Sequence, residues 1–425
     1  MGFRALPSGT RMTLSNLTVP ACLVDNPGDL TTLNLTIENG RITGGSADEF
    51  IDMHRAMVLP CFVDMHTHLD KGHIWPRAKN PDGTFPGALE TVGTDRAANW
   101  SQEDVRARMR FGLECAYAHG TRAIRTHLDS IPPQDSISWP VFSELRDEWA
   151  GRISLQAVSL IGCDSFDSIA SGYADTADVV ASNGGALGMV TYPVADLRKR
   201  LLDFFQLAGD RGLEVDFHSD ETLDGSSEAL RLIAEIVMET GWDLPVTVGH
   251  CCSLSTQDEA GALDTLDLVA KADLNVVSLP MCNLYLQDRT PGRTPRSRGI
   301  TLVHEMKARG INVSFASDNT RDPFYAYGDL DMIEVMRQAT RIGHLDHSDA
   351  DWTNAFFNNP ARACGFDARS LGIGAPADLV ICNARDWTEL FSRPQADRIV
   401  LRDGQPIDTT PPDYAVLDHL METSS

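Results

Sequence analysis

Short apolar segments alternate with longer stretches of helical periodicity from residue 57 to about residue 366. Segments with the length and β-branched content of strands are Met57–Val63, Arg122–Thr126, Ile153–Val158, Ala186–Val190, Leu213–Phe217, Val246–Val248, Leu274–Ser278 and Ile311–Phe315. A helical stretch follows each of these eight segments, for example Gln102–Ala118 after the first and Ser226–Thr240 after the fifth. The alternation predicts an α/β fold, a (β/α)8 TIM-like barrel. An open doubly wound sheet is the alternative, but no predicted strand is followed by Gly-x-Gly-x-x-Gly.

Both ends of the chain have β character instead. Short β segments occupy residues 12 to 58, and Asn39-Gly40 has the composition of a tight hairpin turn. β character returns after residue 370, in Ala377–Cys382 and Arg398–Gly404. We therefore predict a small β-sandwich domain built from residues 1–58 and 368–425, flanking a barrel of residues 59–367.

Composition narrows the class of protein. The 425 residues carry a formal net charge of -24, which argues against nucleic acid or an anionic membrane surface as a partner. No apolar stretch is long enough to span a bilayer, and the N-terminus lacks the pattern of a signal peptide. Nine scattered cysteines without a Cys-x-x-Cys pair indicate reduced thiols. These features predict a cytoplasmic protein.

Polar residues suited to catalysis stand where the predicted strands end. His66 and His68 close the first strand, and residues two apart on a strand face the same way. His218, His250 and Asp318 follow three other strands. Each could alone be a capping residue at a strand-to-helix turn. In a barrel, however, the carboxyl ends of all strands meet at one face, so their joint placement predicts a shared site.

Three imidazoles and one carboxylate form a suitable ligand set for a divalent metal. We predict that His66, His68, His218 and Asp318 bind one Zn²⁺ or Fe²⁺, with a position left open for water. Glu221, three residues after His218, would lie beside that position and move a proton, a role that Asp318 could share. His250 would hydrogen-bond the developing oxyanion. His127 could be a supporting residue or lie at the barrel mouth.

The motifs at these strand ends resemble those of the amidohydrolase superfamily, and within it the cytosine deaminase-like group. The matching pieces are Phe62–Asp70, Arg125–Asp129, Asp216–Glu221, Gly249-His250, Leu286–Arg289, Pro295–Ile300, Gly310–Val313, Asp318–Tyr325 and Gly374–Leu379. The resemblance implies a mononuclear site, a homo-oligomer and a hydrolase of C–N bonds in cyclic amidines. A single metal also follows from the chain itself, because no lysine that could bridge two ions occurs between Lys79 and Lys199.

The expected reaction is hydrolytic deamination of an amino-substituted nitrogen heterocycle, cytosine or a related pyrimidine, with release of ammonia. Phe85, Asn319 and Phe324 match positions that contact the substrate ring in the cytosine deaminase-like group. The sequence departs from that group at two positions that contact the same ring. Leu160–Asp164 lacks the glutamine that hydrogen-bonds the pyrimidine, and Asn319 replaces a second aspartate. A cyclic amide, triazine or creatinine-type amidohydrolase with the same mononuclear site therefore stays open, as does a non-catalytic binding protein.

Overall fold

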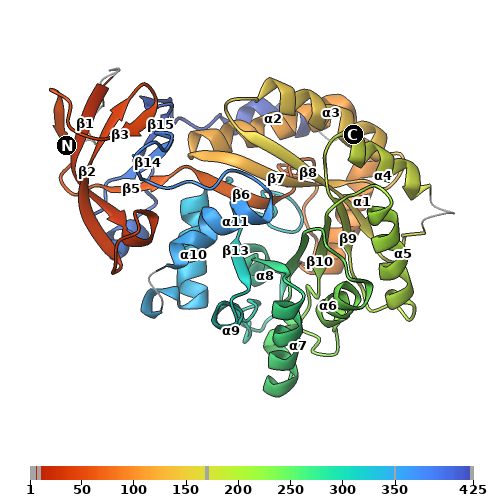
Figure 1. Cartoon of the computed structure of the whole chain (residues 1–425). Helices are drawn as coiled ribbons and strands as arrows, with labels where there is room; N and C mark the ends of the chain where they lie inside the picture. The colour runs from red at the N-terminus through yellow and green to blue at the C-terminus, as the bar shows by residue number, and fades with distance from the viewer. Residues whose placement is uncertain (1–5, 7–10, 168–171, 349–350, 422–425) are drawn as a thin grey trace.

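The computed structural model describes residues 6, 11–167, 172–348 and 351–421 (Figure 1). Parallel strands in the order β6 to β13 form a barrel. Their bounds are β6 (Phe62–Thr67), β7 (Thr121–Asp129), β8 (Ser154–Gly162), β9 (Leu187–Val190), β10 (Val215–Ser219), β11 (Val246–His250), β12 (Asn275–Ser278) and β13 (Asn312–Phe315). The Asp318 amide donates to the His66 carbonyl at 2.9 Å, which closes the ring between β13 and β6. The predicted α/β barrel is confirmed.

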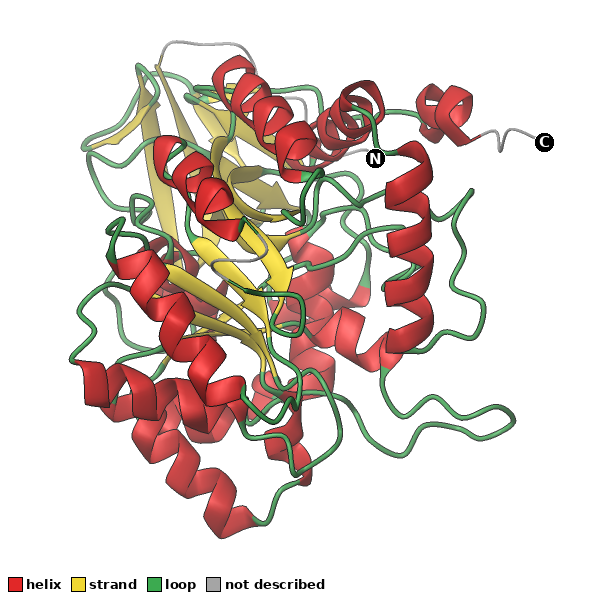
Figure 2. Cartoon of the chain, turned by 90° about the vertical axis from the view of Figure 1, so that its right-hand side faces the viewer, coloured by secondary structure: helices red, strands yellow, loops and turns green. Residues whose placement is uncertain are grey.

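Helices surround the barrel strands, as the view in Figure 2 shows. They are α1 (Phe85–Asn99), α2 (Gln102–Ala118), α3 (Asp135–Glu148), α4 (Tyr173–Ser182), α5 (Leu197–Gly209), α6 (Ala229–Thr240), α7 (Glu259–Lys271), α8 (Pro280–Leu286), α9 (Val303–Ala308), α10 (Met332–Gly343) and α11 (Asn358–Ala363). Short 3₁₀ turns are η1 (Ala21–Leu23), η2 (Cys252–Thr256), η3 (Leu345–His347) and η4 (Trp352–Phe356). The buried faces of the helices pack against strand residues such as Phe217, Val248 and Phe315 to form one large apolar core.

A polar strand end can serve the fold instead of chemistry, and Asp220 is an example. Its carboxylate accepts hydrogen bonds from the Ser227 hydroxyl and from the backbone N–H groups of Ala229 and Leu230. It thereby satisfies free donors at the start of α6, which ends at the left-handed Gly241. Of the adjacent carboxylates Asp220 and Glu221, Glu221 is the one that lines the cavity at the barrel mouth.

The two ends of the chain share a second sheet, in the order β16-β15-β14-β5-β1-β2-β3 with β4 on β1. The bounds are β1 (Arg11–Pro20), β2 (Leu30–Glu38), β3 (Arg41–Thr43), β4 (Phe50–Asp52), β5 (Met57–Pro60), β14 (Leu379–Cys382), β15 (Ile399–Arg402) and β16 (Gln405–Pro406). Figure 1 shows β1 to β3 beside β14 and β15, away from the barrel. Asn39 and Gly40 take φ values of 51° and 77° in the predicted two-residue turn.

The prediction of a single barrel strand over Met57–Val63 is wrong. The Cys61 amide donates to the Asp378 carbonyl of the terminal sheet, whereas the next amide, of Phe62, donates to the Gly120 carbonyl beside β7, both at 2.9 Å. The apolar run is therefore two strands in two sheets, β5 and β6. Its hydrophobicity gives no sign of the division, because both sheets bury this segment. The domain boundaries at residues 58 and 367 stay a prediction.

The end of the described chain returns to the barrel after α12 (Trp387–Ser392) and β16. The turn η5 (Tyr414–Leu417) and α13 (Asp418–Met421) lie against α2, where Leu417 packs with Phe111 and Cys115. All nine cysteines have free thiols. Among the described residues, no helix combines the length and the apolar character needed to cross a membrane.

Candidate active site

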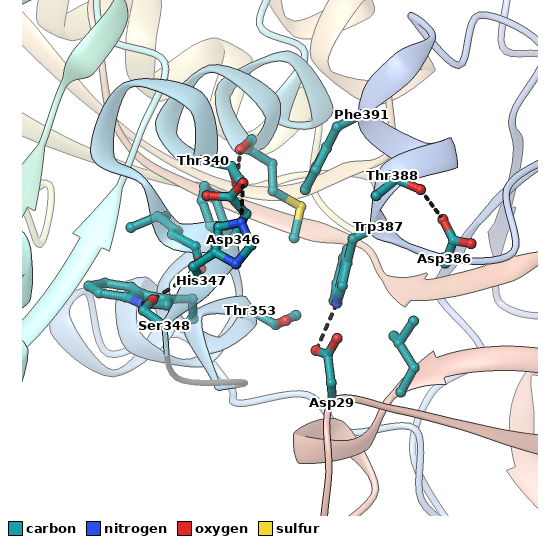
Figure 3. Close-up of a pocket in the computed structure, with 15 residues that line it drawn as sticks. Asp29, Thr340, Asp346, His347, Ser348, Thr353, Asp386, Trp387, Thr388 and Phe391 are labelled. Atoms are coloured by element: carbon teal, nitrogen blue, oxygen red, sulfur yellow. Dashed lines mark hydrogen bonds and ion pairs between the residues drawn. The ribbon is translucent and has the colours of Figure 1, made fainter.

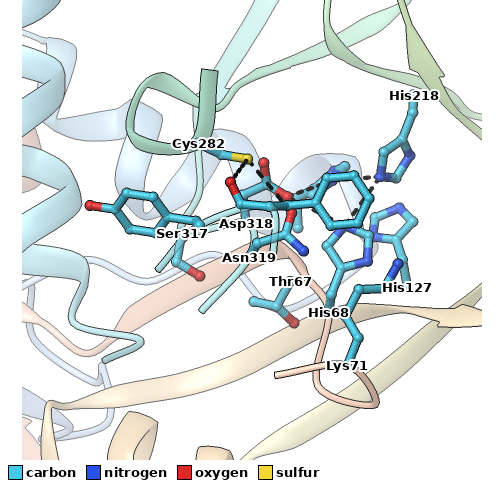
Figure 4. Close-up of polar contacts among 12 residues, drawn as sticks. Thr67, His68, Lys71, His127, His218, Cys282, Ser317, Asp318 and Asn319 are labelled. Carbon is cyan, nitrogen blue, oxygen red and sulfur yellow. Dashed lines mark hydrogen bonds and ion pairs between the residues drawn. The ribbon is translucent and has the colours of Figure 1, made fainter. Parts of the chain in front are cut away.

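Four predicted ligands converge at the carboxyl end of the barrel. The Nε2 atom of His218 lies 3.1 Å from that of His66 and 3.2 Å from that of His68. Asp318 Oδ1 is 3.3 Å from His68 Nε2 and 3.6 Å from His66 Nε2. Figure 4 shows the labelled side chains of this group turned toward one another. All four are buried.

The geometry of this cluster fits a divalent metal. Metal–ligand bonds of about 2.0–2.1 Å in a tetrahedral site place neighbouring ligand atoms about 3.3 Å apart. The observed separations of 3.1 to 3.6 Å match that value. Burial, reinforced by the neighbouring histidines, lowers the pKa of His66, His68 and His218 well below the usual value, so their ring nitrogens carry free lone pairs. The residues present therefore suit Zn²⁺ or Fe²⁺.

Backbone conformation contributes to this convergence. Asp318 has a φ of 63° and His250 a φ of 67°, both in the left-handed region that side-chain-bearing residues rarely adopt. Each residue stands where its chain leaves the barrel, His250 at the last position of β11 and Asp318 three residues past β13. Such strain is found where surrounding structure holds a residue in place for function.

Beside the cluster, Asn283 connects the two predicted catalytic residues. Its Nδ2 atom donates to Glu221 Oε1 at 3.1 Å and to His250 Nδ1 at 3.0 Å. Because Nδ1 of His250 accepts this bond, the ring proton is on Nε2. Burial lowers the pKa of His250 to about 3, so the ring is neutral. Burial and the nearby Asp318 carboxylate raise the pKa of Glu221 well above its usual value.

His127 has a different environment from the four ligands. Its Nε2 atom is 3.2 Å from Asp216 Oδ1, and its ring lies against that of His66 with centroids 4.1 Å apart. A ring nitrogen of His127 still lies within 4.8 Å of those of His66, His68 and His218. With Asp216 holding Nε2, His127 packs against the His66 ring and restricts its orientation.

The metal-ligand candidates His68 and His218 open onto a cavity of about 100 Å³ at the barrel mouth. Phe85 and Phe324 form one wall, with ring centroids 5.5 Å apart in an edge-to-face arrangement. Asn319 also lines the cavity; its amide nitrogen donates to Asp322 Oδ2 at 2.8 Å, and its carbonyl oxygen accepts from the Cys282 thiol at 3.7 Å and retains a second lone pair. The three predicted substrate contacts thus lie on one cavity.

Gly162 stands on the cavity wall at the last position of the third barrel strand, β8, within the segment that lacks the expected glutamine. A Cβ atom there would lie 2.5 Å from Asp164 Oδ1 and 3.0 Å from Tyr192 Cε2. A side chain at this position would collide with the Asp164 carboxylate and crowd the Tyr192 ring, and both Gly162 and Tyr192 line the cavity.

Several cavity residues were not among the sequence-based candidates. Asp129 joins two cations on the wall: Lys71 Nζ lies 2.8 Å from Asp129 Oδ1 and Arg96 Nη1 lies 2.6 Å from Asp129 Oδ2. Asn283 is another such residue. Asp129 and Lys71 stand close to the strand-end motifs and could have been found from them. Asn283 lies in α8, far from Glu221 in the sequence, and no local pattern marks it.

A larger hollow, of about 470 Å³, lies away from this chemistry (Figure 3). Its walls come from η3, η4, α10, α12 and the segment around Asp29. Some of its polar groups are paired with one another: Trp387 Nε1 donates to Asp29 at 2.8 Å and Thr388 to Asp386 at 2.7 Å. No set of ligating atoms converges there among the residues described. Volume alone therefore does not identify the functional site.

Comparison with known proteins gives consistent matches. A profile of the amidohydrolase family matches residues 163–408. Pterin deaminase from Rhizobium rhizogenes (strain K84) is 50% identical over 429 residues, covering 98% of each chain. N-isopropylammelide isopropyl amidohydrolase from Pseudomonas sp. (strain ADP) is 23% identical, covering 81% of this chain and 84% of that one. The structure of 5-methylcytosine deaminase from Klebsiella pneumoniae with 5-fluorocytosine aligns with a TM-score of 0.80 and 25% identity, over 93% and 97% of the two chains.

Proposed function

The chain belongs to the amidohydrolase family, and we propose that it is a metal-dependent deaminase of pterins, which are fused aminoheterocycles. The observation that carries the proposal is the Glu221–Asn283–His250 hydrogen-bond chain beside the cluster of three histidines and one aspartate. A proton carrier, a neutral imidazole donor and a metal-ligand set in one cavity are the parts that hydrolysis of an amidine carbon requires.

We assign His66, His68, His218 and Asp318 as the residues that would hold one divalent ion, Zn²⁺ or Fe²⁺. Such an ion would lower the pKa of a water molecule toward neutrality and so supply the nucleophile. His127, held by Asp216, would fix the orientation of the His66 ring from the side away from the substrate.

Glu221 has the environment of a proton carrier. Its raised pKa suits a group that must take a proton from water and give it to a ring nitrogen of the substrate. The hydroxide oxygen then adds to the amino-bearing carbon, its remaining proton passes through Glu221 to the amine, and the C–N bond breaks with release of ammonia. His250, which has its proton on Nε2, donates to the added oxygen as negative charge develops there. Asn283 holds both residues in position.

Two features support a pterin in preference to cytosine. The first is the relative with 50% identity, whose name specifies a pterin. The second is the cavity lining, where Gly162 and the aromatic ring of Tyr192 stand in place of a polar side chain, together with the aromatic pair Phe85 and Phe324. A pterin contains the 2-amino-4-oxopyrimidine ring, and the Asn319 carbonyl oxygen could accept from its ring N–H.

The proposal is tested with purified protein loaded with Zn²⁺ or Fe²⁺. Ammonia release is measured with pterin, cytosine and isocytosine, and isopropylamine release is measured with N-isopropylammelide. We expect the highest kcat/KM with pterin, and conversion of its spectrum to that of the 2-oxo product. A higher kcat/KM with cytosine or the triazine would contradict the pterin assignment, and absence of ammonia with pterin, cytosine and isocytosine would contradict the deaminase assignment.

A further inference from the structure

One face of α1 lines the active-site cavity. Phe85, Leu89, Val92 and Arg96 all contact it, and their spacing of four, three and four residues places them on one side of a helix. The row begins with the aromatic ring that packs on Phe324 and ends with a guanidinium group. A flat ring system held at Phe85 would therefore have apolar side chains along its length and a cation at the far end.

The guanidinium of Arg96 has donors to spare. Its Nη1 atom contacts Asp129 Oδ2 at 2.6 Å, and Asp129 is its only hydrogen-bond acceptor in the described part of the chain. Asp129 Oδ1 is already occupied by the buried ammonium group of Lys71. The Arg96 side chain is 24% exposed, so its remaining N–H groups can reach a ligand. Two cations thus share one carboxylate on this wall, in a chain whose net charge is -24.

Arg96 also borders a second hollow, on the outer side of the cavity. Arg96 and Ile131 line both spaces, and the outer crevice continues along Gly93, Ala97, Pro132 and Gln134. These two side chains therefore stand between the place for the ring and a crevice that leads to the surface. A substituent on the ring edge away from the scissile amine would pass next to the Arg96 guanidinium.

We propose that Arg96 is a specificity-determining residue that selects substrates with a carboxylate on this ring edge. The proposal rests on the deaminase function proposed above and deepens it. A guanidinium presents a planar fork of N–H groups that pairs with a carboxylate through two hydrogen bonds. Asp129 uses one side of that fork and orients it, and the other side faces the substituent. The carboxylates that share this cavity are Asp129 and Glu221, and Asp129 is neutralised by its two cations.

The experiment compares two substrates of similar size in the metal-loaded enzyme, pterin-6-carboxylate and 6-methylpterin. For Arg96→Met, we expect the ratio of kcat/KM for the carboxylate to kcat/KM for the methyl compound to fall by about 10- to 100-fold, mainly through KM, because hydrogen bonds to charged groups contribute about 1.5–3 kcal/mol. Arg96→Lys keeps the charge and loses the fork, so its ratio should lie between those of the wild type and Arg96→Met.

Arg106→Met is the matched control. Arg106 lies on the neighbouring helix α2, pairs with a single carboxylate, Glu144, and is 30% exposed, but it does not line the cavity. This variant should keep the wild-type ratio. A second measurement needs no variant: raising the ionic strength from about 0.05 to 0.5 M should raise the wild-type KM for the carboxylate more than that for 6-methylpterin, since salt screens a partly exposed charge pair.

An unchanged ratio in Arg96→Met, or equal salt dependence for the two substrates, would overturn the role of Arg96. Either result would leave the deaminase function intact, because ammonia would still be released from the pterins. Failure of the wild type to release ammonia from unsubstituted pterin and from both substituted compounds would instead contradict the proposed function itself.

Discussion

Two groups of polar side chains occupy successive levels of the barrel, and they differ in how their polar atoms are paired. In the deeper group, Arg125 donates to Gln156 at 2.6 Å, to Glu214 at 2.8 Å and to Asp216 at 3.3 Å. In the group at the barrel mouth, the Nε2 atoms of His66, His68 and His218 face one another. The deeper group satisfies itself, whereas the mouth group directs its lone pairs to one point.

The difference shows which polar cluster serves the fold and which one serves a ligand. Buried polar atoms are stable when paired, so a complete network such as that of Arg125 needs nothing further. Neutral nitrogens that converge without donors between them require a cation. Asp216 and His127 connect the two levels, since Asp216 accepts from both Arg125 and His127. The fold can therefore keep its shape while the mouth exchanges ligands.

The largest effect should come from removing the metal. Treatment with a chelator should lower ammonia release by about 10³-fold or more, because an activated water contributes several kcal/mol to the transition state. The far-ultraviolet circular dichroism should remain, because the deeper group needs no ion. Readdition of Zn²⁺ or Fe²⁺ should restore turnover. Full activity in protein shown by elemental analysis to lack metal would contradict the assignment of the mouth group as a metal-binding site.

Glu221→Gln should cause the next largest loss of activity. The amide has the shape of the carboxylate but cannot carry the proton, so kcat should fall by about 10²- to 10⁴-fold. Glu221 is not a ligand in our assignment, so the variant should bind as much metal as the wild type. Near-wild-type turnover in metal-loaded Glu221→Gln would remove this residue from the mechanism.

Arg125→Met tests the deeper group and should affect stability. It would leave the buried Asp216 and the part-exposed Glu214 without their shared cation, and breaking a buried pair such as Arg125–Asp216 costs about 3–5 kcal/mol. Urea titration of the metal-free protein measures the change. Arg106→Met removes an exposed pair and should cost less than about 1 kcal/mol. Equal losses in the two variants would show that the deeper group contributes no special stability.

Much of the mouth group could be predicted from the sequence because its residues follow strand ends. His66-Thr-His68 is a local pattern, and the barrel topology brings His218 and Asp318 to the same face. The fold and the family assignment followed from the same segments. The assignments of individual ligands and of the substrate contacts remain predictions.

Other features depend on contacts that no local pattern records. Asn283 reaches Glu221 across 62 positions of the chain, so only the fold identifies it as part of the site. The division of Met57–Val63 between two sheets likewise depends on distant partners, Asp378 and Gly120. The composition of a segment indicates that it is buried but not against which neighbour.

The smallest predicted effect concerns His73, which shows that unpaired nitrogens alone do not mark a ligand site. Neither ring nitrogen of this buried histidine has a hydrogen-bond partner among the described residues, and its ring packs edge-to-face on Phe111.

Burial lowers the pKa of His73 to about 3, against about 6.5 in the unfolded chain. The folded state thus keeps His73 neutral while the unfolded state binds a proton, so stability is lost as the pH falls through 6.5. Between pH 7 and pH 5 the wild type should lose about 2 kcal/mol more unfolding free energy than His73→Leu, as measured by urea titration. The variant should retain its metal. An identical pH dependence in the two proteins would show that His73 is protonated in the folded state, and loss of metal from His73→Leu would place this residue with the group at the barrel mouth.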